Sequence, residues 1–244
     1  MPNKNKYNTA ELVAVLSSRT LENNKVVFVG AGLPLISAAL AQRTHAPNLR
    51  ILFEGGIISP EILIGGLPLS TNESRSAYKA VMLPSPTDLF SLQQRGYIDY
   101  GFLGGAQIDK FGNLNTSFIG DSENPKVRLP GSGGGNDIIT SCTKTIIATH
   151  HEKRRFVEKV DFITSPGYLN GNKDRENSGL IFGKIYKVIT HLAIFEFDEK
   201  SKLMKLAAIH PGVEVNEVIE NTGFKPIIPK NVARTKAPTD KELK

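Results

Sequence analysis

The fold class of this chain is decided by the stretch Lys25-Val26-Val27-Phe28-Val29-Gly30-Ala31-Gly32-Leu33-Pro34. Its first half is β-branched and aromatic, which is typical of a buried strand, and the glycines that follow allow a tight turn. Pro34 suits the first turn of a helix, where its missing N–H costs no hydrogen bond. Small and apolar residues continue from Leu35 to Ala41. The stretch therefore predicts a strand, a glycine turn and a helix.

The same pattern recurs along the chain. Residues 8–22 and 136–143 have the spacing of apolar side chains expected for helices. Strands that alternate with helices predict an α/β domain with an open, mostly parallel sheet and flanking helices. The further strands of this sheet are expected at residues 49–53, 97–103, 145–149 and 160–164.

The later part of the chain predicts an antiparallel extension of this sheet. Residues 184–191 and 192–198 are strand-like, and no helix separates them. Asp198-Glu199-Lys200-Ser201 is typical of a hairpin turn, and residues 202–209 would form the returning strand. One more helix is expected between Gly212 and Gly223.

Length and charge indicate one domain without a nucleic-acid-binding face. The 244 residues are 40% hydrophobic, and we expect a single domain over residues 1–224. A basic, proline-containing tail would follow at residues 225–244. Residues 1–6 and 225–244 carry the whole net charge of +6. Since the interior of the chain is neutral, no nucleic-acid partner is expected. The cluster Lys153-Arg154-Arg155 is either a solvated surface or a contact for a phosphate.

Other classes of protein are excluded by what the sequence lacks. No apolar run approaches the roughly 18 residues of a membrane helix. The single cysteine, Cys142, rules out an internal disulfide and favours a reducing cytoplasm, where we expect the protein to be. It should pack as a small apolar side chain. His150 and His151 are adjacent, so a strand would point them to opposite faces, and no zinc site is expected.

Glu54 is the most informative single residue. It ends an apolar run and is followed by Gly55 and Gly56, an unusual setting for a surface charge. The carboxyl ends of strands in open α/β sheets face the ligand crevice, and glycines allow a substrate to approach closely. Glu54 is therefore either a catalytic carboxylate or a structural one that accepts hydrogen bonds from loop N–H groups.

Two glycine turns could bind an anion or an oxyanion. Gly30-Ala31-Gly32 lacks the third glycine of a dinucleotide fingerprint, because Leu35 stands there, so it is either a plain turn or an anion site. The segment Arg128-Leu129-Pro130-Gly131-Ser132-Gly133-Gly134-Gly135-Asn136-Asp137 has four glycines in five residues. It is not a P-loop. Its exposed N–H groups favour a binding loop over a flexible linker.

Three motifs together resemble the β subunit of class I CoA-transferases, most closely the glutaconate CoA-transferase type. The resemblance covers most of residues 10–225. It is carried by Phe53-Glu54-Gly55-Gly56, by Phe102-Leu103-Gly104-Gly105-Ala106-Gln107-Ile108-Asp109 with Gly112-Asn113-Leu114-Asn115, and by the glycine-rich segment 128–137.

The resemblance implies the open α/β fold shared by CoA-transferases and sugar-phosphate isomerases. It also implies a homologous α subunit as partner, in a heterodimer or larger assembly, without which the enzyme is inactive. Glu54 would be the nucleophile that forms a covalent glutamyl-CoA thioester. Coenzyme A would be a cosubstrate, an acyl-CoA and a carboxylic acid (a dicarboxylic acid among the candidates) the substrates, and no metal or tightly bound cofactor would be needed. The substrate-, CoA- or oxyanion-binding glycines would be Gly30, Gly32, Gly55, Gly56, Gly131, Gly133, Gly134 and Gly135.

Other functions stay open beside this one. Relatives of the same fold are hydrolases or decarboxylases of CoA esters, and a non-catalytic sensor of a phosphorylated metabolite is a further alternative. Ser122-Glu123-Asn124-Pro125 imitates the Ser-Glu-Asn-Gly string that carries the glutamate in other class I transferases. Since proline replaces the glycine and the string lies in a polar loop, we interpret it as a turn.

Overall fold

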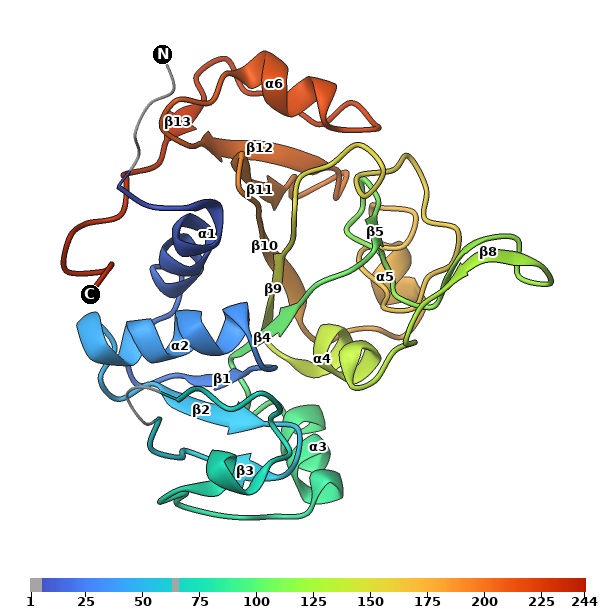
Figure 1. Ribbon diagram of the computed structural model, residues 1–244. Helices are drawn as coiled ribbons and strands as arrows, with labels where there is room; N and C mark the ends of the chain where they lie inside the picture. The colour runs from blue at the N-terminus through green and yellow to red at the C-terminus, as the bar shows by residue number, and fades with distance from the viewer. Residues whose placement is uncertain (1–5, 63–65) are drawn as a thin grey trace.

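The computed structural model describes residues 6–62 and 66–244. An open sheet of nine strands runs through the molecule (Figure 1). Its strands are β1 (Val26–Phe28), β2 (Arg50–Phe53), β3 (Ile57–Ile58), β4 (Tyr100–Leu103), β9 (Lys144–Ala148), β10 (Lys184–Ile189), β11 (Ala193–Phe197), β12 (Met204–Ile209) and β13 (Ala233–Arg234). In space they lie in the order β13-β12-β11-β10-β9-β4-β1-β2-β3.

The sheet is parallel at its centre and antiparallel toward one side. β1 pairs in parallel with β2 and β4, and β9 pairs in parallel with β4 and β10. β10, β11 and β12 are antiparallel neighbours, and the predicted turn at residues 198–201 joins the last two. The open, mostly parallel sheet with an antiparallel extension is therefore confirmed.

Helices cover both faces of the parallel part (Figure 1). α1 (Thr9–Ser18) and α2 (Leu33–Thr44) pack on one face, and α3 (Pro86–Gln94) and α4 (Gly135–Ser141) pack on the other. Neighbouring residues of β1 serve the two layers, because strand side chains alternate in direction. Val27 belongs to the cluster of α1 and α2, and Phe28 belongs to that of α3 and α4.

Smaller elements complete the chain. α6 (Val215–Glu220) lies in the segment predicted to hold a helix, over β12. The others are the two-stranded pairs β5 (Gln107–Ile108) with β6 (Leu114–Asn115) and β7 (Phe118–Gly120) with β8 (Pro125–Arg128), the 3-10 helix Ser74–Ala77 and the short helix α5 (Asp174–Asn177). Within the described residues, no helix is long and apolar enough to cross a membrane.

One predicted strand is wrong. Residues 160–164 form irregular structure, in which Phe162 and Ile163 are exposed. The place beside β9 that this strand would take is filled by β10. An apolar run becomes a strand only where a neighbouring strand offers free backbone partners, and none was left for these residues.

The predicted C-terminal tail does not leave the domain. Within residues 225–244, β13 adds to the edge of β12 as a parallel strand. Further on, Arg19 of the first helix cap donates to the carbonyl oxygens of Lys236 and Ala237, and it forms an ion pair of 2.7 Å with Glu242. The segment is mostly exposed, but it runs along the domain as an anchored strap.

Candidate active site

A cavity of about 570 Å³ lies at the carboxyl ends of five neighbouring parallel strands. Each strand end contributes at least one residue to its wall. In the spatial order of the strands from β2 to β10, these are Glu54, Gly30, Gly104, Thr149 with His150, and His191. Ligands of open α/β sheets bind at this edge. We name this space the strand-end cavity.

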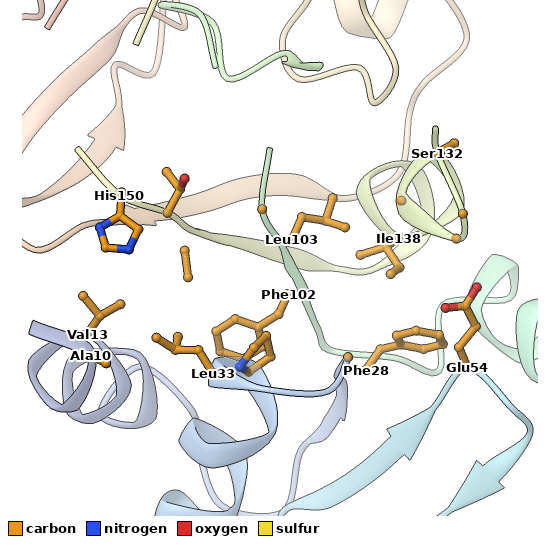
Figure 2. Close-up of a pocket in the computed structure, with 18 of the residues that line it drawn as sticks. Ala10, Val13, Phe28, Leu33, Glu54, Phe102, Leu103, Ser132, Ile138 and His150 are labelled. Carbon is orange, nitrogen blue, oxygen red and sulfur yellow. The ribbon is translucent and has the colours of Figure 1, made fainter. Parts of the chain in front are cut away.

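Glu54 stands at one end of the strand-end cavity. β2 ends at Phe53, which is completely buried, so the next side chain is fixed where the strand leaves the core. The Glu54 side chain is half-buried and points toward the glycine-rich loop (Figure 2). Among the described residues, none forms an ion pair or a hydrogen bond with its carboxylate. The carboxylate is thus free to react with a molecule in the cavity.

The glycine-rich loop comes close to this carboxylate, although almost 80 residues separate the two in sequence. A Cβ atom added at Gly134 would lie 3.1 Å from Glu54 Oε1 and 3.1 Å from Phe90 Cζ. The ring of Phe90 in turn packs against that of Phe28, with centroids 6.0 Å apart. Only a residue without a side chain leaves room for the carboxylate between the loop and these rings.

Most N–H groups of the loop are already bonded. Those of Gly131 and Gly135 donate to Thr116 O and Ser132 O, each at 2.8 Å. The N–H groups of Gly133 and Gly134 have no acceptor within the part of the chain that the structure describes, and both residues line the cavity. These two groups are therefore the ones available to an oxyanion or to a substrate carbonyl.

The glycines after Glu54 shape the turn and do not line the cavity. Gly56 has a φ of +85°, and its N–H donates to Phe53 O at 3.0 Å. A Cβ atom there would lie 2.1 Å from Pro84 O, and one at Gly55 would lie 2.5 Å from Asn72 Oδ1. The two glycines bring residues 71–85 against the strand end and so hold the backbone of Glu54 in place.

The first glycine turn contributes one of its two glycines to the wall. Gly30 lines the cavity together with Leu33 and Pro34 at the start of α2. Gly32 precedes the helix with a φ of +82° and lies outside the lining. Of the eight glycines singled out by the sequence, the structure gathers Gly30, Gly133, Gly134 and Gly135 around the cavity.

The two adjacent histidines point in different directions, as the strand pattern predicted. His150 lines the cavity, whereas His151 is buried and hydrogen-bonds Thr190 and Thr222. Burial, with His191 and His210 nearby, lowers the pKa of His151 to about 3, so this imidazole is neutral. No group of three or more metal-ligating side chains occurs in residues 6–62 and 66–244.

Sequence reasoning missed His191. It follows β10 as His150 follows β9, and the two imidazole rings lie 5.6 Å apart at the end of the cavity opposite Glu54. The rule that singles out Glu54, a polar residue directly after an apolar strand, could have found it. The sequence pattern instead joins two strands at this residue without a helix between them, which hides the side chain that follows the first.

The remaining candidates lie away from the cavity. The cluster at 153–155 does not contribute to the lining, and Arg154 pairs with Glu152 at 2.6 Å. Residues 122–124 lie between β7 and β8, so the imitation of the transferase string is a turn. Cys142 is buried at the end of α4, and burial raises the pKa of its thiol.

Comparisons with known proteins agree on one family. A family model described as coenzyme A transferase matches residues 10–221. One of the two kinds of chain in the 3-oxoadipate CoA-transferase of Pseudomonas knackmussii is 40% identical over 97% of this chain and 91% of its own length. The crystal structure of glutaconate coenzyme A-transferase from Acidaminococcus fermentans superposes with a TM-score of 0.91 at 36% identity, over 99% of this chain and 94% of that one. The IpdB subunit of a cholesterol ring-cleaving hydrolase from Rhodococcus jostii is 27% identical over 89% of this chain and 85% of its own length.

Proposed function

Because the chain belongs to the coenzyme A transferase family, we propose that it is the β-type subunit of an enzyme that moves CoA between an acyl-CoA and a carboxylic acid, with Glu54 as the covalent nucleophile. One observation carries the proposal. Glu54 is a carboxylate without a hydrogen-bond or ion-pair partner among the described residues, at a strand end inside a cavity, against two free N–H groups.

The reaction begins with attack of a Glu54 carboxylate oxygen on the thioester carbonyl. The new C–O bond forms, the C–S bond breaks, and CoA leaves as a thiolate from a mixed anhydride. The thiolate then attacks the Glu54 carbonyl of that anhydride. This step releases the first acid as a carboxylate and leaves Glu54 bound to CoA as a thioester. A second carboxylate repeats the two steps in reverse and leaves as the new acyl-CoA.

The arrangement suits each step without a proton donor or an energy source. A glutamate is ionised at neutral pH and needs no general base. Each intermediate keeps an activated acyl bond, so no nucleotide triphosphate is consumed. The tetrahedral oxyanion needs donors, and we assign this role to the N–H groups of Gly133 and Gly134. Loss of one such donor typically costs about 3–4 kcal/mol in other enzymes.

A homologous α subunit would complete the enzyme. Two of the relatives, from a 3-oxoadipate and a glutaconate CoA-transferase, are each named as one subunit of the enzyme. The segment after β3 also exposes large apolar side chains, such as Leu69 at 88% and Val81 at 72%. An apolar surface of this kind favours contact with another protein chain. Since residues 71–85 pack against the turn after Glu54, a partner seated there would lie beside the nucleophile.

The proposal is tested by trapping the intermediate. The assembly purified from its own cells is incubated with an acyl-CoA, and the glutamyl thioester is captured with hydroxylamine or borohydride. We expect mass labelling of the peptide that contains Glu54, and no labelling of Glu54→Gln. Glu123→Gln is the matched control, because Glu123 lies in the sequence that imitates the transferase string, and it should label like the wild type.

Labelling on another peptide would contradict the role of Glu54. Release of free acid or carbon dioxide without an acceptor acid would identify a hydrolase or a decarboxylase in place of a transferase. A screen of carboxylic acids as acceptors, dicarboxylic acids included, then defines the substrate of the transfer. We propose dicarboxylic acids for this screen because the similar transferases are named for 3-oxoadipate and glutaconate.

A further inference from the structure

The strand-end cavity is polar at both ends and apolar between them (Figure 2). Glu54 and Ser132 lie at one end, and His150 lies at the other. The wall between them is built largely from apolar side chains, such as Leu33, Phe102 and Leu103. The proposed chemistry uses only the first end. The second end holds His150, His191 and Thr149, which no step of the transfer requires.

The bond made by His191 fixes which of its ring nitrogens can serve a ligand. His191 Nδ1 accepts a hydrogen bond of 3.2 Å from the backbone N–H of His151. In the neutral ring the proton is then on Nε2, which leaves an N–H donor. Within the described part of the chain, no acceptor is bonded to Nε2. Burial lowers the pKa of His191, which keeps the ring neutral.

The surroundings of this donor favour an uncharged acceptor. Glu152 and Glu217 are the carboxylates that act on His191, and both would repel an anion. A phosphate or a second carboxylate is thus disfavoured at this end. An amide carbonyl or a hydroxyl oxygen suits a neutral imidazole N–H.

The length of the cavity indicates a long ligand. Glu54 and His191 follow β2 and β10, which are separated by four strand spacings, or roughly 19 Å. The two side chains shorten this gap by several ångströms. The pantetheine arm of CoA contains about as many chain bonds as four amino-acid residues and extends over roughly 14 Å. It carries two amides and a hydroxyl on an otherwise aliphatic chain.

From these observations we propose that the strand-end cavity holds the pantetheine arm of CoA, with its sulfur at Glu54, and that His191 Nε2–H donates to an amide carbonyl or hydroxyl oxygen of the distal half of the arm. The inference rests on the proposed function, which places the thioester at Glu54. His150 is exposed, so the cavity is open at this end, where the bulky nucleotide of CoA can remain outside. The acyl group then lies on the other side of Glu54. His191 is a binding residue for the carrier and sets no acyl preference.

Two substitutions separate the proposed contact from the structural one. His191→Asn keeps an acceptor near the position of Nδ1 for the His151 N–H and removes the Nε2 donor. His191→Gln returns an amide N–H to the region of Nε2. The substrates are glutaryl thioesters of CoA, of pantetheine and of N-acetylcysteamine. The last ends after the first amide and cannot reach His191.

We expect His191→Asn to lower kcat/KM about tenfold for the CoA and pantetheine thioesters, as for loss of one hydrogen bond, and to leave the N-acetylcysteamine thioester within about twofold. His191→Gln should regain part of the loss. An equal loss with all three carriers, no loss with any, or a loss that follows acyl length instead of carrier length would overturn the inference.

Calorimetric binding of free pantetheine keeps this test independent of the chemistry. If Glu54 fails to label, the proposed function fails. The inference still stands if pantetheine binds the wild type about tenfold more tightly than His191→Asn, and it falls if the two affinities are equal. Unfolding temperatures of both variants, compared with that of the wild type, show that the His151 contact is kept.

Discussion

Replacing Gly134 by alanine tests the contact between the glycine-rich loop and Glu54. Gly134 has φ −78° and ψ 4°, which alanine can adopt, so the backbone has no reason to change. The new Cβ atom would lie 3.1 Å from both Glu54 Oε1 and Phe90 Cζ, closer than the 3.4 Å of ordinary contact, and a neighbour must move by a few tenths of an ångström. Phe90 is held by its packing on Phe28. The carboxylate, which has no bonded partner among the described residues, is the group that yields.

The expected loss follows from this displacement. A misplacement of about 1 Å at a reacting centre can cost roughly a hundredfold in rate, so a few tenths correspond to about three- to tenfold. We expect the Gly134→Ala assembly to form the trapped glutamyl thioester that much more slowly in a single turnover. The free energy of unfolding should change by less than about 1 kcal/mol, since no core contact is lost.

A matched control separates this local effect from the addition of a methyl group in general. Gly66→Ala meets nothing closer than Arg75 at 3.8 Å and should keep both rate and stability. A Gly134→Ala protein that forms the thioester at the wild-type rate would refute the close approach of the loop to Glu54. A large fall in unfolding temperature would show that the loop responds by rearranging instead.

Two further predictions concern stability. Gly56→Ala should lower the free energy of unfolding by more than about 2 kcal/mol, because it places a side chain at a φ of +85° and 2.1 Å from Pro84 O; thermal unfolding beside Gly66→Ala measures this, and an unchanged midpoint would contradict the turn geometry. The pKa of His151 falls from its ordinary value of 6.5 to about 3 on burial, so its contribution to stability is complete above pH 6.5 and is lost as the pH falls toward 3. His151→Gln should therefore flatten the dependence of the unfolding temperature on pH in that range, and parallel curves for the two proteins would contradict a buried neutral imidazole.

Local patterns were enough to predict the architecture. The strand at 25–29, its glycine turn and the helix with Pro34 in its first turn follow from side-chain periodicity and backbone preferences, which act over a few residues. The hairpin at 198–201 and the buried Cys142 follow in the same way. Where local patterns failed, the cause was competition for partners. Residues 160–164 have the composition of a strand, but β10 occupies the neighbouring place beside β9.

Glu54 could be singled out from the sequence because a carboxylate directly after an apolar strand and before two glycines is locally unusual. Its surroundings could not be predicted. The approach of Gly134 and Phe90 to that carboxylate, and the position of His191 at the far end of the same cavity, depend on the order in which β10, β9, β4, β1 and β2 pair. Strand order is set by packing between segments distant in sequence, for which no short stretch of residues carries a signal. Local residue patterns thus specify the elements and the nucleophile candidate, whereas long-range packing selects the groups that share a cavity with it.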